Sequence, residues 1–140
     1  MTYNELLEKL QTEANEMSKD KIFFFFGSET EIKDKMDAKG LQPNDLVYLG
    51  AGGYVKKEYA DEVNTFLDNQ QQQKKDYALA NPYEVVKHYC WDYEIEISLS
   101  YTYLDVVYIL MNFTKEEALE RKDEINRAFE DYKREFYEIN

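Results

Sequence analysis

Residues 46–57 have the sequence LVYLGAGGYVKK, a hydrophobic run followed by three glycines within four positions. Glycines after a strand can hold a phosphate, but the two motifs of this kind require a fixed spacing. A dinucleotide site needs Gly-x-Gly-x-x-Gly at the start of a helix, and a P-loop needs Lys followed by Ser or Thr. Gly50-Ala51-Gly52-Gly53-Tyr54-Val55 satisfies neither pattern. The stretch instead predicts a strand at 46–49, a tight glycine turn and a short extended piece at Tyr54-Val55.

The residues before this stretch predict a helix, a strand and a second helix. Residues 2–17 place leucines at helical spacing and predict an amphipathic helix. Residues 21–26, KIFFFF, form a β-prone run, and four consecutive Phe residues are costly to expose, so we expect a strand that is covered on both faces. Ser28 and Glu31 have the spacing of a capping box and predict a helix that ends at Gly40.

The residues after the glycine turn are mainly helical by pattern. Apolar residues share a helical face from Lys57 onward, and the polar tract 70–75, QQQQKK, fits either a solvated continuation of that helix or a mobile loop. Asn81-Pro82 predicts a new helix, with Asn as N-cap and Pro in the first helical position. Thr114 and Glu117 have capping-box spacing and predict a long terminal helix. Its apolar stripe consists of Ala118, Leu119, Ile125, Ala128, Phe129, Tyr132 and Phe136.

The segment between these helices leaves two interpretations. Residues 93–100 alternate between apolar and polar, which predicts a half-buried strand that completes a small antiparallel sheet. The alternative continues the preceding helix, with Asp92 and Glu96 on one side. Residues 102–113 are apolar nearly all round and predict a short buried helix. The predicted fold is a single α+β domain over residues 1–140, mostly helical around a small antiparallel sheet.

The composition limits the classes of partner. The chain has 29 acidic and 17 basic residues, a formal net charge of −12, which argues against direct binding to nucleic acid or to an anionic membrane. Its partners should therefore be basic proteins. A single cysteine excludes an intramolecular disulfide, and no window has the apolar length of a signal peptide or a membrane span. We therefore expect a cytoplasmic protein.

His88 is the only histidine, and it limits the chemistry that can be proposed. Cys90 lies two residues away, on a different face of a helix, so a Cys-His dyad is not expected and Cys90 is interpreted as a small buried hydrophobe. Glu84, His88 and Asp92 lie at i, i+4 and i+8 on one helical ridge and are candidate zinc ligands. Simple charge pairs on an exposed ridge explain the same spacing. We expect no catalytic site and no cofactor, with zinc as the alternative.

The segment 83–105 concentrates acidic and aromatic residues around one lysine, Lys87. On a strand, Glu94 and Glu96 would point the same way about 7 Å apart, close to the spacing of successive phosphates in an extended single strand of nucleic acid. Such a surface suits a protein interface. The alternative is an edge strand that charge protects from aggregation. The candidate partner-binding residues are Trp91, Tyr93, Glu94, Glu96, Tyr101, Tyr103 and Asp105.

Three stretches carry a family resemblance: LVYLGAGGYVKKE at 46–58, SYTY at 100–103, and NFTKEE at the end of an apolar helix. In this order they resemble an uncharacterised family of small acidic proteins from phages and Firmicutes, over roughly the middle two thirds of the chain. Members of that family have Asn-His-Glu-Tyr shortly before the Tyr-Thr. This chain has Glu96-Ile97-Ser98-Leu99 there, so the resemblance does not imply an activity that depends on that His-Glu pair.

The resemblance implies an origin in a mobile element and, by analogy, an inhibitor of host defence. The resulting hypothesis is a phage-encoded anti-CRISPR protein that binds a nucleic-acid-guided nuclease such as Cas9 through the acidic, Tyr-rich surface. It would block the loading of nucleic acid, in the manner of a DNA mimic, in the cytoplasm of the bacterial host. The alternative is a small zinc-binding domain or a metal-dependent enzyme.

Overall fold

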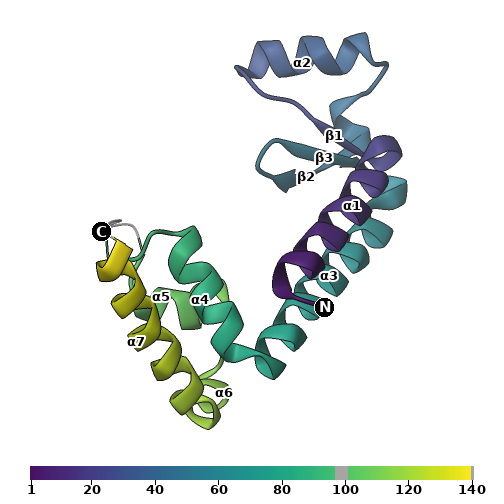
Figure 1. The fold of residues 1–140 in the computed structure, drawn as a ribbon. Helices are drawn as coiled ribbons and strands as arrows, with labels where there is room; N and C mark the ends of the chain where they lie inside the picture. The colour runs from purple at the N-terminus through teal and green to yellow at the C-terminus, as the bar shows by residue number, and fades with distance from the viewer. Residues whose placement is uncertain (97–100, 140) are drawn as a thin grey trace. The chain divides into compact units, whose positions relative to one another are not determined.

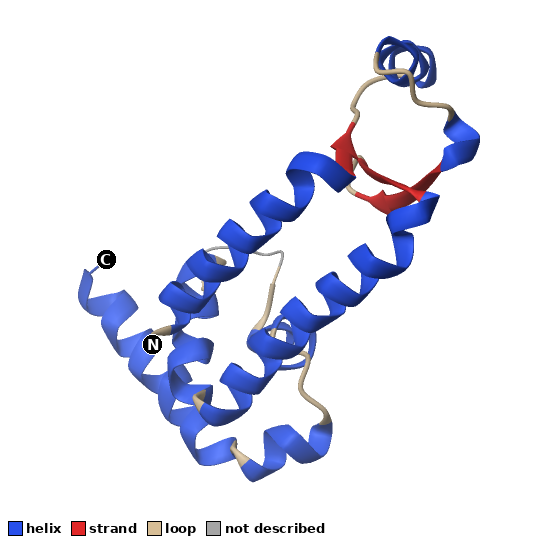
Figure 2. Cartoon of the chain, turned by 90° about the vertical axis from the view of Figure 1, so that its right-hand side faces the viewer, coloured by secondary structure: helices blue, strands red, loops and turns tan. Residues whose placement is uncertain are grey.

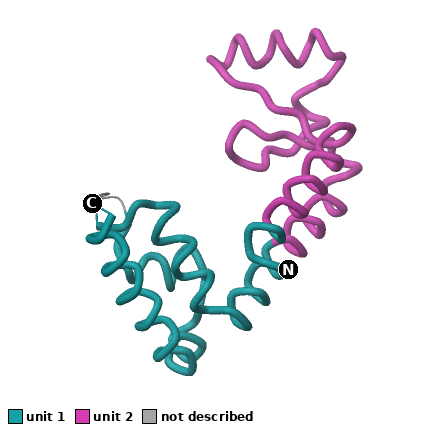
Figure 3. The backbone as a smooth tube through the Cα atoms, in the orientation of Figure 1, with its two compact units in different colours: residues 1–6, 71–140 teal, residues 7–70 magenta. Residues whose placement is uncertain are grey.

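The computed structural model describes residues 1–96 and 101–139. Most of them lie in helices, and three short strands form one antiparallel sheet (Figure 1, Figure 2), which confirms the predicted α+β class. The chain divides into two compact units (Figure 3): unit 1 contains residues 1–6 and 71–140, and unit 2 contains residues 7–70. Helices α1 (Tyr3–Lys21) and α3 (Ala60–Ala80) contribute residues to both units. The expectation of a single domain stays a prediction.

Unit 2 contains the sheet. Its strands, in spatial order, are β1 (Ile22–Phe24), β3 (Gly53–Lys56) and β2 (Leu46–Gly50). The central strand β3 pairs antiparallel with both neighbours, so that Val55 lies opposite Ile22 on one side and Val47 on the other. The glycine turn joins β2 directly to β3, and the strand, turn and extended piece predicted for residues 46–57 are confirmed.

Helix α2 (Glu29–Ala38) supplies part of the hydrophobic core of unit 2. The Ser28 side chain accepts a hydrogen bond from the N–H of Glu31 at 3.2 Å, which confirms the predicted N-cap. The buried core residues are Phe25, Met36, Leu41 and Leu46, and Phe23, Ile32 and Tyr54 pack against them.

The run of four Phe residues is covered on one side only. Phe23 and Phe25 contribute to the core, whereas Phe24 is 56% and Phe26 is 59% exposed. The prediction that residues 21–26 are covered on both faces is therefore wrong. Side chains along an extended chain alternate between two faces. Phe23 and Phe25 therefore share the face toward the core of unit 2, and Phe24 and Phe26 lie on the exposed face.

Helix α3 continues through residues 70–75, so the helical interpretation of the polar tract is correct. Gln70 is buried, and its Nε2 donates a hydrogen bond to the carbonyl oxygen of Leu10 at 2.8 Å. A buried amide needs such a partner, which explains why this polar tract can form part of a packed helix. Across the ranges 1–96 and 101–139, the structure has no helix that combines the length and the apolar character needed to cross a membrane.

Unit 1 is built around α4 (Pro82–Asp92) and α7 (Lys122–Ile139), which lie side by side (Figure 1). The start of α4 at Pro82 confirms the prediction from Asn81-Pro82. The two helices bury apolar residues at helical spacing, namely Val85, Val86, Cys90, Ile125, Ala128 and Tyr132. Two polar contacts flank this core: Tyr83 donates to Asp131 and Lys87 donates to Glu135, both at 2.6 Å.

Residues 102–113 do not form the predicted all-round buried helix. A capping box at Thr102 begins α5 (Tyr103–Asp105), and a π-helical turn at Val106–Leu110 follows it. Val106 and Val107 are buried, but Leu104, Tyr108 and Ile109 are exposed. The prediction of burial is wrong because apolar composition does not by itself specify which faces of a segment have a partner.

The predicted terminal helix begins correctly and then breaks. The capping box of Thr114 and Glu117 is present and starts α6 (Lys115–Glu120), but the chain leaves the helix at Arg121 and resumes as α7. The Arg121 guanidinium donates to the carbonyl of Glu117 at 3.0 Å and to that of Leu79 at 2.8 Å. Leu119, which the prediction placed in the apolar stripe, is 67% exposed, so the prediction is wrong for this residue.

Candidate functional site

The predicted partner-binding residues lie in unit 1, at the end of α4, in the turn after it and at the start of α5. The rings of Tyr93 and Tyr101 are 4.6 Å apart between centroids, and the Tyr103 hydroxyl donates a hydrogen bond to the carboxylate of Glu96. Trp91 packs edge-to-face against a residue of α7. We call this surface the acidic–aromatic face. It consists of Trp91, Tyr93, Glu94, Glu96, Tyr101, Tyr103 and Asp105.

Residues 93–96 form a turn, so the predicted strand is wrong for these residues, and its remaining residues, 97–100, lie outside the described ranges. Ile95 is 2% exposed; its N–H donates to the carbonyl of Cys90 at 3.0 Å, and its own carbonyl accepts from the buried Tyr132 hydroxyl. On either side of it, Glu94 and Glu96 have φ values of 50° and 91°. The expected match between the two glutamates and nucleic-acid phosphates depended on a strand and is lost with it.

The carboxylate of Glu96 is held by two tyrosine hydroxyls. Tyr103 donates to one oxygen and Tyr137 donates to the other at 3.2 Å. Burial, followed by the hydrogen bond to Glu96, raises the pKa of Tyr103, and the bond to Glu96 raises the pKa of Tyr137, so both phenols remain donors at neutral pH. The Nζ of Lys133 lies 4.7 Å from the centre of the Tyr103 ring. Lys133 and Tyr137 come from α7, and the sequence pattern around residue 96 gave no indication of either.

The negative charge of the face is not neutralised internally. Among the residues that the structure describes, Glu94 and Glu96 form no ion pair. By contrast, Glu135 in the same unit pairs with Lys87 at 2.6 Å. The face therefore presents two carboxylates, those of Glu94 and Glu96, next to aromatic rings and without an ion pair from the described chain.

Asp105 differs from the other acidic residues of the face. Its Oδ2 accepts a hydrogen bond from the N–H of Thr102 at 2.8 Å, while the Thr102 hydroxyl accepts from the Asp105 N–H at 3.3 Å. This reciprocal pair is the capping box that starts α5. Asp105 is therefore a structural residue of the face, because its carboxylate is used to begin a helix.

The candidate zinc ligands Glu84, His88 and Asp92 line a cavity of about 590 Å³. The carboxylate of Glu84 is used within unit 1, because one oxygen accepts from the N–H of Tyr3 at 3.2 Å and the other accepts from the Tyr77 hydroxyl. In residues 1–96 and 101–139, no three His, Cys, Asp or Glu side chains form a group that could hold a metal ion. The described residues therefore do not assemble the predicted ridge into a metal site.

His88 is part of an aromatic cluster that the sequence did not predict. Its ring lies 5.0 Å from that of Tyr3 and 5.2 Å from that of Tyr89, and the two tyrosine hydroxyls are 2.6 Å apart. Burial lowers the pKa of His88, although the charges of Asp92 and Glu84 act in the opposite direction. The helical spacing of Tyr3 with the leucines that follow it was the available sign of its burial.

The thiol of Cys90 is predicted to be inert in the folded protein. Cys90 is 0% exposed, and burial raises the pKa of its thiol to about 12. Since the thiolate is the reactive form, iodoacetamide at pH 8 should leave the native protein unmodified and add one adduct in concentrated urea, as measured by intact mass. Cys90 is the only cysteine, so the adduct count reports this residue alone. Rapid alkylation of the native protein would contradict the buried placement.

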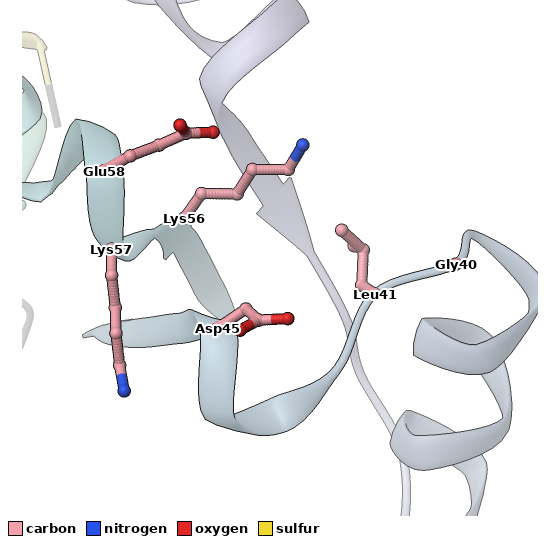
Figure 4. A pocket seen from close by; sticks show the side chains of 6 residues that line it. All are labelled: Gly40, Leu41, Asp45, Lys56, Lys57 and Glu58. Carbon is pink, nitrogen blue, oxygen red and sulfur yellow. The ribbon is translucent and has the colours of Figure 1, made fainter.

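A cleft of about 340 Å³ lies in unit 2 beside the two lysines that end the stretch 46–57 (Figure 4). Lys56 and Lys57 extend in opposite directions, and the other charged side chains that line the cleft are Asp45 and Glu58. The mixed charge does not favour an anion, and the residues lining the cleft do not include the glycines of the turn. The cleft therefore gives no support to phosphate binding.

Comparisons with known proteins place the chain in a family without adding an activity. A search of curated proteins and a search of solved structures find no significant match. One family model, described as Family of unknown function (DUF7659), matches residues 2–135. Because this match covers nearly the whole sequence, the chain belongs to that family.

Proposed function

We propose that the protein acts by binding, and that its acidic–aromatic face docks on a basic protein surface. The observation that carries this proposal is the pair of carboxylates on Glu94 and Glu96, which lack ion pairs from the described residues and adjoin aromatic rings. Charges at an interface accelerate association and select the partner, while Trp and Tyr supply much of the affinity. Such a face suits a partner with Lys and Arg beside apolar surface.

The backbone of the turn supports a functional use of this face. Non-glycine residues with positive φ, such as Glu94 and Glu96, cost of order 1–3 kcal/mol each and persist only where the surroundings hold them. Here the buried Ile95 and its bond from Tyr132 hold the turn. Such conformations concentrate at binding and catalytic sites, and this turn carries two carboxylates beside a buried residue.

We propose further that the partner is a nucleic-acid-guided nuclease such as Cas9, and that the protein is a phage-encoded inhibitor that acts in the cytoplasm of a bacterial host. The net charge of −12 and the family resemblance support this choice. Nucleic-acid grooves are rich in Lys and Arg, so an acidic protein surface can compete for them. This competition requires carboxylates that lie close together on the surface. It does not require them to have the spacing of successive phosphates in nucleic acid.

The test is cleavage of target DNA by guide-loaded Cas9, with the protein in molar excess and added either before or after the DNA. We expect inhibition only when the protein is added first, and weaker inhibition at moderate than at low salt, because screening weakens charge pairing. Glu94→Lys should reduce inhibition at least about tenfold, equivalent to about 1.4 kcal/mol of binding. Asp68→Lys is the matched control, since it makes the same charge change at an exposed residue outside the face.

Two results would contradict the proposal in different ways. Equal inhibition by Glu94→Lys and Asp68→Lys would exclude the acidic–aromatic face as the docking surface. Full cleavage in the presence of the wild-type protein at both salt concentrations would exclude Cas9 as the partner. The Trp91 fluorescence of each variant should match the wild type, which shows that unit 1 remains folded.

A further inference from the structure

A second surface of unit 1 has the opposite character to the acidic–aromatic face. Residues of α5, the π-helical turn, α6 and α7 line an apolar groove of about 390 Å³. Leu104 and Leu119 lie at the groove and are 68% and 67% exposed, while Val107 and Phe129 also line it. Large apolar side chains that are exposed together typically mark an interaction site.

The groove lies beside two departures from regular helix. The π-helical turn at Val106–Leu110 buries Val107 while leaving its neighbours Tyr108 and Ile109 exposed. The break at Arg121 ends α6 early and leaves Leu119 outside the core. Both departures are held by contacts within unit 1, including the bonds from Arg121 to backbone carbonyls.

The charge at the groove indicates the chemistry of its occupant. Within the described part of the chain, the charged side chains that line the groove are both lysines, Lys115 and Lys122, and neither forms an ion pair there. The groove therefore combines exposed apolar side chains with two positive charges and no negative charge among its described lining residues. These features complement a ligand that is apolar on one side and carries carboxylates at the edges of that side.

We propose that this groove binds an amphipathic helix from a partner protein, with an apolar stripe flanked by Glu or Asp. Helices of this kind place side chains at i, i+3 or i+4 and i+7 into apolar grooves, and their flanking charges select the groove. The leucines receive the apolar stripe, and Lys115 and Lys122 receive the carboxylates. A second copy of the chain is disfavoured, because a two-fold contact would bring both pairs of lysines into one interface.

The test uses the full-length protein and three fluorescently labelled peptides of about four helical turns. The first carries Leu at i, i+3 or i+4 and i+7 with flanking Glu, the second has Lys in place of Glu, and the third has the first composition in scrambled order. Fluorescence polarisation should show binding of the acidic amphipathic peptide only. Leu119→Asp should weaken it at least about tenfold, whereas Ile139→Asp, at an apolar residue that is 73% exposed outside the groove, should leave it unchanged.

The contribution of the lysines is tested separately. The double variant Lys115→Glu and Lys122→Glu should lose the acidic peptide and gain the basic one, and both effects should weaken as salt rises. Equal binding of the acidic and basic peptides by the wild type, or no binding of either, would overturn the proposal. So would a concentration-dependent dimer in analytical ultracentrifugation that Leu119→Asp abolishes, because a second copy would then be the occupant. None of these results depends on nuclease inhibition.

Discussion

Tyr132→Ala should lower the free energy of unfolding by roughly 3–5 kcal/mol, as expected for truncation of a fully buried aromatic residue. Tyr132 is 0% exposed, and its ring lies 4.8 Å from that of Trp91 and 5.9 Å from that of Phe136. Its hydroxyl also donates to the carbonyl of the buried Ile95. The substitution leaves a cavity and an unpaired buried carbonyl together, which is why the effect is large.

Urea unfolding followed by tryptophan fluorescence measures this effect well, because Trp91 is the only tryptophan and contacts Tyr132. Tyr132→Phe keeps the ring and removes only the donor, so it should cost about 1–3 kcal/mol. Ile139→Ala, at a residue that is 73% exposed on the same helix, should stay within about 0.5 kcal/mol of the wild type. If Tyr132→Phe has the same urea midpoint of unfolding as the wild type, the hydrogen bond from Tyr132 to Ile95 does not stabilise the turn.

The same variants connect stability with the proposed function. Tyr132→Phe removes the bond that fixes Ile95 between the two glutamates with positive φ. Without this bond the turn would sample more conformations, and the carboxylates of Glu94 and Glu96 would point in more directions. Docking would then have to order them, which costs conformational entropy. Tyr132→Phe should therefore weaken binding of the partner more than its effect on unfolding alone explains.

The features that could be predicted from the sequence depend on neighbours in the chain. The caps at Ser28 and Thr114 and the start of α4 at Pro82 each use residues within three or four positions. The glycine turn between β2 and β3 was predictable for the same reason, since φ preferences and the missing phosphate motif are local properties. Local chemistry therefore predicted the class of the fold and most helix starts.

The features that could not be predicted depend on contacts between distant residues. Alternation at 93–96 is compatible with a strand, and only the bond from Tyr132, 37 residues later, shows why Ile95 is buried in a turn instead. Tyr137 reaches Glu96 across 41 positions. The exposure of Phe24 and Leu119 also depends on distant residues, because a side chain is buried only where another part of the chain packs against it. The residue types of the candidate site are visible in the sequence. Their arrangement in space depends on contacts that only the folded chain makes.

Gly52→Ala should be more damaging than alanine at Gly40 or Gly50, the positive-φ glycines where a Cβ would meet no heavy atom within 4 Å. Gly52 has a φ of 81°, which costs a residue with a side chain about 1–2 kcal/mol. A Cβ there would also lie 2.3 Å from a ring carbon of Phe26, so the ring has to move. Together these effects should lower the stability of unit 2 by about 2–4 kcal/mol. Hydrogen exchange of the β3 amides measures this locally.

Gly40→Ala separates the two causes. Gly40 has a φ of 70°, but no heavy atom lies within 4 Å of a Cβ built there, so only the backbone penalty applies. In a Phe26→Ala background, Gly52→Ala should cost no more than Gly40→Ala, because the ring that opposes it is gone. An unchanged cost of Gly52→Ala in that background would show that the contact is unimportant. If the cost of Gly52→Ala falls in that background, glycine is needed at position 52 because it leaves room for the ring of Phe26. The LVYLGAGGYVKK stretch then has a structural role that involves no phosphate.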